Sequence, residues 1–372
     1  MAASDPGSGR PVVSVIVPAR NEEACLGACL ESLVSQTGVN FEIIVVDDGS
    51  IDRTRRIAQS FAGVHVIDAG PLPPGWTGKN NAMAAGTKQA RGEWLLFTDA
   101  DTVHRPGSLA RALAEANQQG AALLSYSPEQ EVHGFWEKAV MPVIFAELAA
   151  TYPPAKVNDP ASPIAAANGQ YLLISREAYD AVGGHAKIAS DLLEDVAMAR
   201  LVKSSGRKIF FRYGGDAVRT RMYRNFAQLR EGWAKNLVLL FPSPVRLAVL
   251  WLTEFVLIVG SATAAITAGL RGRWQPAAAA AILAMVLYAF LLKRIRKAHF
   301  PWDANSLALI GLPLFSYLLL RSSVLYKRGR VVWRGRTYPS RPRDVREQTR
   351  PETAVKEPAF RPALGPQRKS GL

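Results

Sequence analysis

Apolar runs that end in acidic or small polar residues recur along the N-terminal half of the chain. They cover Val12–Arg20, Phe41–Ser50, the shorter Val64–Ile67, and Glu93–Asp101. Runs of this kind are typical of buried parallel strands, and segments with helical patterns separate them. Strand alternating with helix predicts an α/β fold, a doubly wound and mostly parallel sheet with helices on both faces. Such sheets bind ligands at the edge formed by the carboxyl ends of their strands.

Helices are expected after the first two strands. We place one at Asn21–Gln36, where acidic residues in the first turn would suit the helix dipole, and one at about 52–61. The two cysteines of the chain, Cys25 and Cys29, lie four residues apart in the first of these helices. We expect them to pack in the core rather than to form a disulfide or a metal site.

Three long apolar stretches follow in the last third of the chain. Leu247–Leu270 contains a single charged residue, Glu254, whereas Trp274–Leu292 and Ala304–Leu320 contain none. The first stretch is long enough to cross a bilayer. Core helices of a soluble second domain are the alternative, but these stretches leave little polar surface to face water. We therefore predict a C-terminal α-helical membrane region.

This pattern divides the chain into four parts. We expect a disordered N-terminus at 1–10, an α/β domain at 11–236, transmembrane or interfacial helices at 237–326, and a basic, largely disordered tail at 327–372. The formal net charge is +14, and the basic residues concentrate around the apolar stretches and in the tail. This placement indicates attraction to anionic lipid headgroups, and we expect no nucleic-acid partner.

The orientation in the membrane contains a conflict. No signal peptide precedes the first strand, so we expect a multi-pass protein of the cell membrane with its α/β domain in the cytoplasm. If all three stretches crossed the bilayer, the basic segment 321–336 would lie outside, against the positive-inside rule. We favour two full crossings, with the remaining stretch re-entrant or interfacial.

Charged side chains near the expected ligand edge suggest phosphate chemistry. Asp99 and Asp101 are two residues apart, so an extended backbone would project both carboxylates from one face. Hard carboxylate oxygens suit Mg²⁺ or Mn²⁺, which are commonly held by one or two carboxylates plus substrate phosphates. Lys79 lies at an expected helix start, where its charge opposes the dipole, and a phosphate would explain it better than plain solvation.

The segment 133–152 has apolar residues at helical spacing and permits two interpretations. It is either an amphipathic helix on the membrane surface or a helix packed in the core. The prolines between Pro153 and Pro163 indicate a loop or lid near the active-site edge.

Four motifs occur in order on the predicted elements. They are PARNEE at Pro18–Glu23, VVDDGS at Val45–Ser50, TDAD at Thr98–Asp101 and LLEDVAMA at Leu192–Ala199. In this order and at these intervals they resemble the family-2 glycosyltransferases, which have a GT-A fold. The resemblance covers about Val12–Asn236 and extends to the membrane-spanning architecture behind it. The segments GWTGKNNA, RMYRNF and EGWAKN are similar to hopanoid-associated, carotenoid-acid and ceramide glycosyltransferases.

The resemblance implies roles for individual residues. Asp195 would be the general base that takes the proton from an acceptor hydroxyl, with inversion at the anomeric carbon. Asp101 would hold a divalent metal on the diphosphate of a nucleotide sugar, most simply a UDP-hexose. The residues expected to bind the nucleotide sugar are Pro18, Arg20, Glu22, Asp48, Lys79 and Asp99. Inverting transfer also needs no protein nucleophile, only a base and a clamp on the leaving diphosphate.

The acceptor side is expected at Gly183, Gly184 and Trp233. Processive relatives carry a Gln-x-x-Arg-Trp element in which the Trp stacks on an acceptor sugar. Here Gly232 stands in place of that Arg, and Gln228 is one position too far away. This departure favours a single transfer to a membrane lipid acceptor at the lipid bilayer.

Other functions remain as alternatives. One is a membrane-bound synthase acting on a polysaccharide or polyprenyl-phosphate acceptor. A nucleotidyltransferase would need a Gly-rich phosphate loop after the first strand, and a dehydrogenase would need G-x-G-x-x-G, whereas PARNEE contains no glycine. A non-catalytic scaffold would have no reason to keep Asp48, Asp99, Asp101 and Asp195 together.

Overall fold

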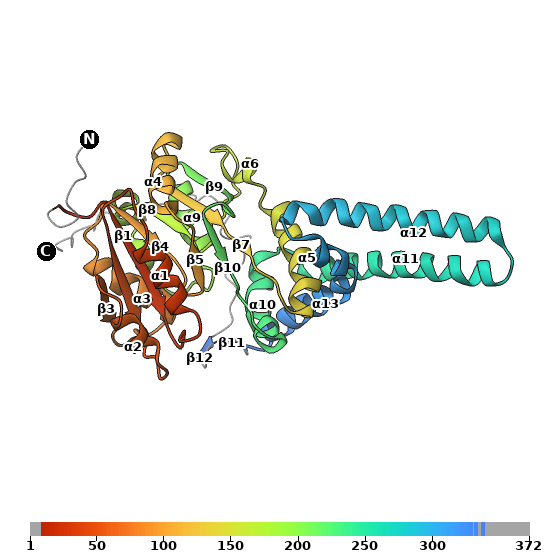
Figure 1. Cartoon of the computed structure of the whole chain (residues 1–372), viewed down its shortest axis with the longest axis horizontal. Helices are drawn as coiled ribbons and strands as arrows, with labels where there is room; N and C mark the ends of the chain where they lie inside the picture. Colours follow the sequence, from red (N-terminus) through yellow and green to blue (C-terminus); the bar gives the residue numbers. More distant parts are fainter. Residues whose placement is uncertain (1–8, 330, 334–335, 339–372) are drawn as a thin grey trace, which may run out of the picture.

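The computed structural model describes residues 9–329, 331–333 and 336–338. It has an α/β domain at the N-terminal end and a helical region from which two long helices extend away from the body (Figure 1). The predicted disordered N-terminus lies almost wholly outside the described residues, as does most of the predicted tail. Within the tail, the structure describes a two-stranded pair, β11 (Val331–Trp333) and β12 (Arg336–Tyr338), which the sequence analysis did not anticipate.

The central sheet confirms the predicted fold class. It has seven strands in the order β3-β2-β1-β4-β8-β6-β9, and all neighbours are parallel except those of β8. The strands are β1 (Val13–Ala19), β2 (Phe41–Asp47), β3 (Val64–Asp68), β4 (Trp94–Phe97), β6 (Leu123–Ser127), β8 (Leu172–Ser175) and β9 (Ile209–Tyr213). β1 and β2 pair from Val13 with Phe41 to Ala19 with Asp47, so their carboxyl ends lie level.

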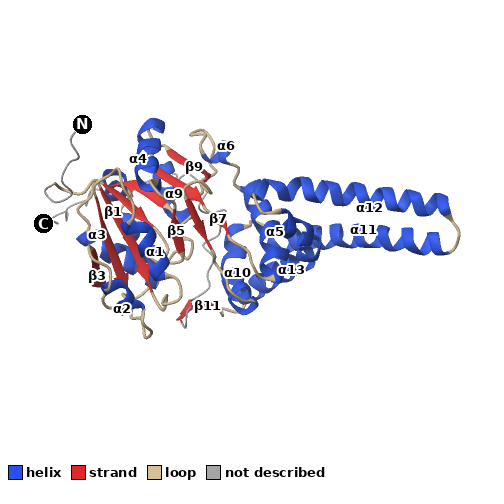
Figure 2. Cartoon of the chain, viewed as in Figure 1, coloured by secondary structure: helices blue, strands red, loops and turns tan. Residues whose placement is uncertain are grey.

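Helices cover both faces of the sheet (Figure 2). Val13, Val15 and Val17 of β1 pack in one buried cluster with residues of α1 (Leu26–Val34) and α4 (Ser108–Gln119). Ile16 points to the opposite face and packs in a second cluster with α3 (Gly78–Gln89) and α9 (Glu194–Ser204). This alternation buries both sides of the strand, which explains why its sequence is an almost uninterrupted apolar run.

The first helix begins later than predicted, at Leu26 rather than Asn21. Asn21 adopts a left-handed conformation with φ of 54°. Its backbone N–H donates to Ser50 Oγ, and the N–H of Glu22 donates to Thr54 Oγ1 at 2.7 Å. Side chains after β2 therefore hold the segment before α1 in a conformation that is not helical. The predicted second helix is also shorter, since α2 covers Thr54–Gln59.

A small sheet lies beside the large one and was not predicted. Its order is β5-β10-β7, from β5 (Thr102–His104), β10 (Val218–Thr220) and β7 (Glu129–Gln130). β5 directly follows the TDAD motif, and β10 pairs antiparallel with it. The pairing joins the acidic loop to the segment that leads into the helical region.

Five helices form that region: α5 (Phe135–Thr151), α10 (Phe226–Leu240), α11 (Pro244–Leu270), α12 (Trp274–Ile295) and α13 (Trp302–Lys327). Three segments, α11, Trp274–Ala298 and α13, are long and apolar enough to cross a membrane. α11 and α12 form the extending hairpin, and only 11% of each span is buried in the protein, whereas half of the α13 span is buried. α5 packs against α13 with Val140, Met141 and Ile144 buried, which supports the core-packing interpretation of segment 133–152.

α13 crosses the foot of the hairpin and does not run along it (Figure 1). Ser306 accepts a hydrogen bond from Tyr288 near the end of α12, and Ser316 donates to the carbonyl of Ala248 near the start of α11. Further along, Tyr326 donates to the carbonyl of Lys235 in α10. Each contact lies at the end of the hairpin next to the α/β domain.

A close approach between α13 and α5 depends on Gly311. A Cβ atom there would overlap the carbonyl oxygen of Ala139 in α5. By contrast, a Cβ at Gly260 in α11 would meet nothing within 4 Å. We predict that Gly311→Ala lowers stability by about 1–3 kcal/mol, the usual cost of overpacking. Gly260→Ala should be neutral or slightly stabilising because alanine favours helix. Thermal unfolding in detergent measures both, and equal melting temperatures would show that the helices do not meet at Gly311.

Candidate active site

A cavity of about 650 Å³ lies where the carboxyl ends of β1, β2 and β4 face the helical region. Most of the residues expected at the site line it. They are Pro18, Arg20, Glu22, Asp48, Lys79, Asp99, Asp101, Asp195 and Trp233. The structure thus brings together side chains from the whole length of the α/β domain.

The ends of β1 and β2 form one side of the cavity. The N–H of Asp48 donates to the carbonyl of Ala19 at 2.9 Å, and the guanidinium of Arg20 lies 3.5 Å from the Asp48 carboxylate. The neighbouring Asp47, not Asp48, accepts the turn hydrogen bond from the N–H of Ser50. Asp48 therefore faces the cavity, and the role of a turn residue falls to Asp47.

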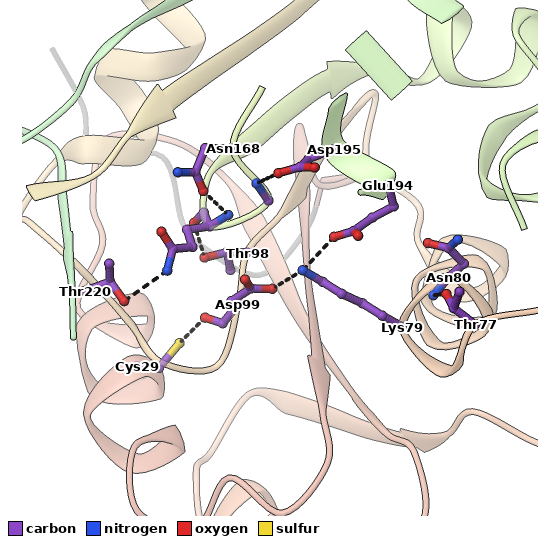
Figure 3. A network of polar contacts seen from close by, with 12 residues as sticks. Cys29, Thr77, Lys79, Asn80, Thr98, Asp99, Asn168, Glu194, Asp195 and Thr220 are labelled. Carbon is purple, nitrogen blue, oxygen red and sulfur yellow. Dashed lines mark hydrogen bonds and ion pairs between the residues drawn. The ribbon is translucent and has the colours of Figure 1, made fainter. Parts of the chain in front are cut away.

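Lys79 is the centre of the polar network (Figure 3). It lies in the first turn of α3, whose N-cap Thr77 accepts a hydrogen bond from the N–H of Asn80. Its ammonium lies 2.6 Å from Asp99 Oδ1 and 2.6 Å from Glu194 Oε1. Burial lowers the pKa of Lys79, but the two carboxylates outweigh burial and raise it above its usual value. The ammonium is therefore charged, and its unfavourable place in the helix dipole is compensated by these two partners.

Glu194 and Asp195 occupy the first turn of α9 and have different environments. The N–H of Gly169 donates to Asp195 Oδ2 at 2.9 Å, and the N–H of Val196 donates to Oδ1 at 2.8 Å. Burial and the adjacent charge of Glu194 together raise the pKa of Asp195 to about 6. Burial would also raise the pKa of Glu194, but Lys79 outweighs it and the pKa is lowered. The pair thus offers one permanently charged carboxylate and one that exchanges a proton near neutral pH.

The loop 168–170 is a functional element that the sequence analysis missed. A Cβ at Gly169 would lie 3.1 Å from both Glu194 Oε1 and Lys79 Nζ, so glycine allows the backbone N–H to approach Asp195. The side chain of Asn168 accepts from the N–H of Gln170 and shapes the loop. The motif NGQ at Asn168–Gln170, shortly before β8, is the sequence signal that indicates this loop.

Asp99 and Asp101 reach the cavity through a turn and not from an extended strand. The N–H of Thr102 donates to the carbonyl of Asp99 at 3.3 Å, which closes the turn. Within the described part of the chain, no group of three or more His, Cys, Asp or Glu side chains is placed to hold a metal ion. One or two carboxylates at a diphosphate site nonetheless fit Mg²⁺ or Mn²⁺, because substrate phosphates and water complete the coordination of these ions.

Trp233 is packed tightly at the boundary of the cavity and is only 2% exposed. Its indole N–H donates to the sulfur of Met141, and its ring lies 6.0 Å from that of Phe145 and 6.1 Å from that of Tyr223. A Cβ at Gly232 would overlap the ring of Tyr223. This packing explains why glycine stands where processive relatives have arginine.

Gly183 and Gly184 lie outside the lining of the cavity, as the N-cap and the first residue of the short helix α8 (Gly184–Lys187). A Cβ at Gly184 would lie 2.5 Å from the Tyr179 ring, so the glycine allows close packing there. The next residue, His185, is buried within α8 and bonds to the Tyr179 hydroxyl at 2.9 Å, and burial lowers its pKa to about 3. The structure therefore gives Gly183 and Gly184 a packing role and offers no contact with the site.

Replacing Lys79 should destabilise the protein in a pH-dependent way. In Lys79→Met, Glu194 loses the cation that lowers its pKa, so burial raises this pKa above that of the unfolded chain. The loss of stability should be present at about pH 8 and shrink towards about pH 5 as Glu194 protonates. At the higher pH we expect the free energy of unfolding to fall by about 2 kcal/mol. This is less than the 3–5 kcal/mol lost when a fully buried ion pair is broken, because Lys79 is 33% exposed.

Lys88→Met is the matched control, since Lys88 is exposed at the end of the same helix. Thermal unfolding of both variants at the two pH values checks the expectation. A loss of stability for Lys79→Met that does not change with pH would contradict the electrostatic explanation.

Residues 14–183 match the model of the family described as Glycosyl transferase family 2. The 4,4'-diaponeurosporenoate glycosyltransferase of Staphylococcus aureus (strain USA300) is 32% identical over 234 residues, which are 60% of this chain and 60% of that protein. The same enzyme of the bovine strain RF122/ET3-1 is 31% identical over the same lengths. The chain thus spans about 60% of the length of these curated relatives.

A solved structure agrees in fold. The mannosyltransferase of Pyrobaculum calidifontis, determined with GDP-Man and Mn²⁺, has a TM-score of 0.50 and 19% identity, covering 87% of this chain and 88% of that one. At this identity the likeness shows the fold alone. Residues 14–183, most of the α/β domain, thus match glycosyl transferase family 2, and the sheet of this domain agrees with a GT-A fold.

Proposed function

We propose that this protein transfers a sugar from a nucleotide diphosphate sugar to a membrane lipid, with inversion at the anomeric carbon. The observation that carries the proposal is the cluster of Lys79, Asp99, Glu194 and Asp195 in one cavity. This cavity extends from the carboxyl edge of the sheet to the foot of the apolar hairpin. A water-soluble donor and a lipid acceptor can meet only at such a boundary.

The donor is expected at the edge formed by β1 and β2. Asp48 and Arg20 line the cavity there, and a carboxylate facing a cavity suits the N–H groups of a nucleobase. The mannosyltransferase structure with GDP-Man and Mn²⁺ supports a nucleotide sugar in this fold. UDP-hexose is the donor that we would test first.

Asp195 is the proposed general base. As the acceptor oxygen attacks the anomeric carbon, the hydroxyl proton passes to Asp195 and the bond to the diphosphate breaks, so a nucleoside diphosphate leaves with the electron pair. One displacement without a protein nucleophile inverts the anomeric carbon. Lys79 supplies a positive charge beside the leaving group. A divalent ion, when bound by Asp101 and Asp99, would further stabilise the charge on the diphosphate.

The acceptor is proposed to be a membrane lipid. The S. aureus relatives are described as diaponeurosporenoate glycosyltransferases, and a carotenoid acid is a lipid. A polysaccharide acceptor is disfavoured because Gly232 and Tyr223 pack where processive enzymes keep their arginine. These observations support one transfer per lipid molecule.

We propose that α11 and α12 cross the bilayer and that α13 lies at its surface. α13 contacts the hairpin only at its foot, so the basic residues that follow it would stay on the side of the α/β domain, in the cytoplasm. This arrangement removes the conflict with the positive-inside rule. Arg271→Cys in the hairpin turn should be labelled only from outside the cell, and Arg328→Cys only from inside. Labelling of Arg328→Cys from outside would require three crossings.

The pH dependence of transfer provides one test of the base. Because the pKa of Asp195 is about 6, kcat/KM should fall below about pH 6 as its carboxylate protonates. Glu194→Gln removes a neighbouring negative charge and should move this fall to lower pH. Asp195→Asn should lower kcat by about 10²- to 10⁴-fold while nucleotide binding is kept. Radiolabelled UDP-hexose and extracted membrane lipids measure these rates, and normal turnover by Asp195→Asn would remove it as the base.

The metal is tested by nucleotide binding. Asp101→Ala should weaken UDP binding in Mn²⁺ but have little effect in excess chelator, because the side chain acts through the ion. Isothermal titration calorimetry of the full-length protein in detergent checks this. Asp303→Ala is the control, since Asp303 pairs with Lys138 at 2.6 Å outside the cavity. Equal binding by wild type in Mn²⁺ and in chelator would contradict metal dependence.

A further inference from the structure

The cavity continues past the reactive carboxylates to a wall built by the helical region. Residues of α5, α10 and the α12–α13 connection form it. We call Phe145, Leu148, Ala149, Leu240 and Ala298 the apolar wall. None of them carries a charge or a side-chain hydrogen-bonding group, so the apolar wall adds nothing to the binding of a nucleotide or a sugar.

Specific contacts hold the three parts of the wall together. The hydroxyl of Tyr152, the residue that ends α5, donates to the carbonyl of Leu240 at 2.7 Å and joins α5 to α10. His299 stacks on Tyr213 at the end of β9 with ring centroids 4.0 Å apart and an angle of 11°. The stack joins the α12–α13 connection to the α/β domain. These contacts therefore hold the apolar wall in a fixed position relative to the α/β domain.

The apolar wall lies at the foot of the membrane hairpin. Leu240 is the last residue of α10, and α11 begins at Pro244. Ala298 follows shortly after α12 ends at Ile295. Exposed basic residues surround this point at Lys293, Arg294, Arg296 and Lys297. Basic side chains at this level favour anionic headgroups and would hold the foot of the hairpin at the bilayer surface.

The inner end of the cavity holds the polar groups that the polar end of an acceptor would meet. Glu194 is buried and Asp195 is half-buried beside it, and the ammonium of Lys79 lies 2.6 Å from Glu194 Oε1. Lys235 of α10 also lines the cavity. A hydroxyl group that reaches Asp195 can donate a hydrogen bond to its carboxylate.

We propose that the apolar wall binds the hydrocarbon chain of the lipid acceptor, which enters from the bilayer at the foot of the hairpin with its polar end towards Asp195. This inference rests on the proposed function and names the place where the acceptor's chain binds. A sugar polymer is polar and would gain little from contact with an apolar wall. Trp233 is also packed too deeply to offer a stacking surface to a sugar. The chain of a lipid is the ligand that matches an apolar surface continuous with the membrane side of the protein.

Photo-crosslinking tests the wall without requiring turnover. The full-length protein in lipid nanodiscs is irradiated with a long-chain fatty alcohol that carries a diazirine in its chain, and the labelled peptides are mapped. We expect label on residues 145–149 and on Leu240. Leu148→Trp should fill the space and reduce this label about tenfold, the lower end of steric discrimination in an apolar pocket. Leu250→Trp is the control, because Leu250 is 56% exposed on α11 and does not line the cavity.

Label confined to α11 and α12 in the wild-type protein would overturn the proposal, whether or not Leu148→Trp folds. Failure of the proposed function looks different. In that case the alcohol would label the wall, but no sugar would be transferred from any nucleotide sugar. Sugar transfer to lipid without label on the wall would leave the proposed function standing and remove the apolar wall as the acceptor site.

Discussion

The ammonium of Lys79 joins three parts of the chain that are far apart in the sequence. It contacts Asp99 after β4 and Glu194 at the start of α9, and it belongs itself to the first turn of α3. Without this cation, several carboxylates would share a poorly solvated cavity and repel one another. With it, Glu194 stays charged and Asp195 is left to titrate near neutral pH. The arrangement of charged side chains around the cavity depends on this balance of charge.

The helical region gives the cavity its second side. α5, α10 and the α12–α13 connection complete the lining, and the same elements pack against α13 at the foot of the hairpin. A change in how the hairpin is seated would therefore alter the shape of the cavity. In the proposed membrane arrangement, this coupling would hold the cavity at a fixed height at the bilayer surface.

Local patterns were enough to predict the sheet and to bring most of the expected site residues to one cavity, because the apolar runs end where the strands end and their polar residues collect at one edge. Contacts between distant segments had no such signal. The N–H of Gly169 on Asp195, the pairing of Lys79 with Glu194 and the small sheet after Asp101 depend on the way that separate loops meet. Gly184 is predicted on the acceptor side because it follows the apolar residues of the segment Asn168–His185. In the structure Gly184 packs against the ring of Tyr179, and the periodicity of the sequence does not indicate this contact.

The central claim is that this cavity glycosylates a membrane lipid with Asp195 as the base. The most direct measurement is mass spectrometry of total lipids from cells that express the wild-type protein, the Asp195→Asn variant or neither. The account predicts a new lipid that is heavier by one hexose in wild-type cells and absent from the other two. Identical lipid profiles in all three, with both proteins present in the membrane, would contradict it.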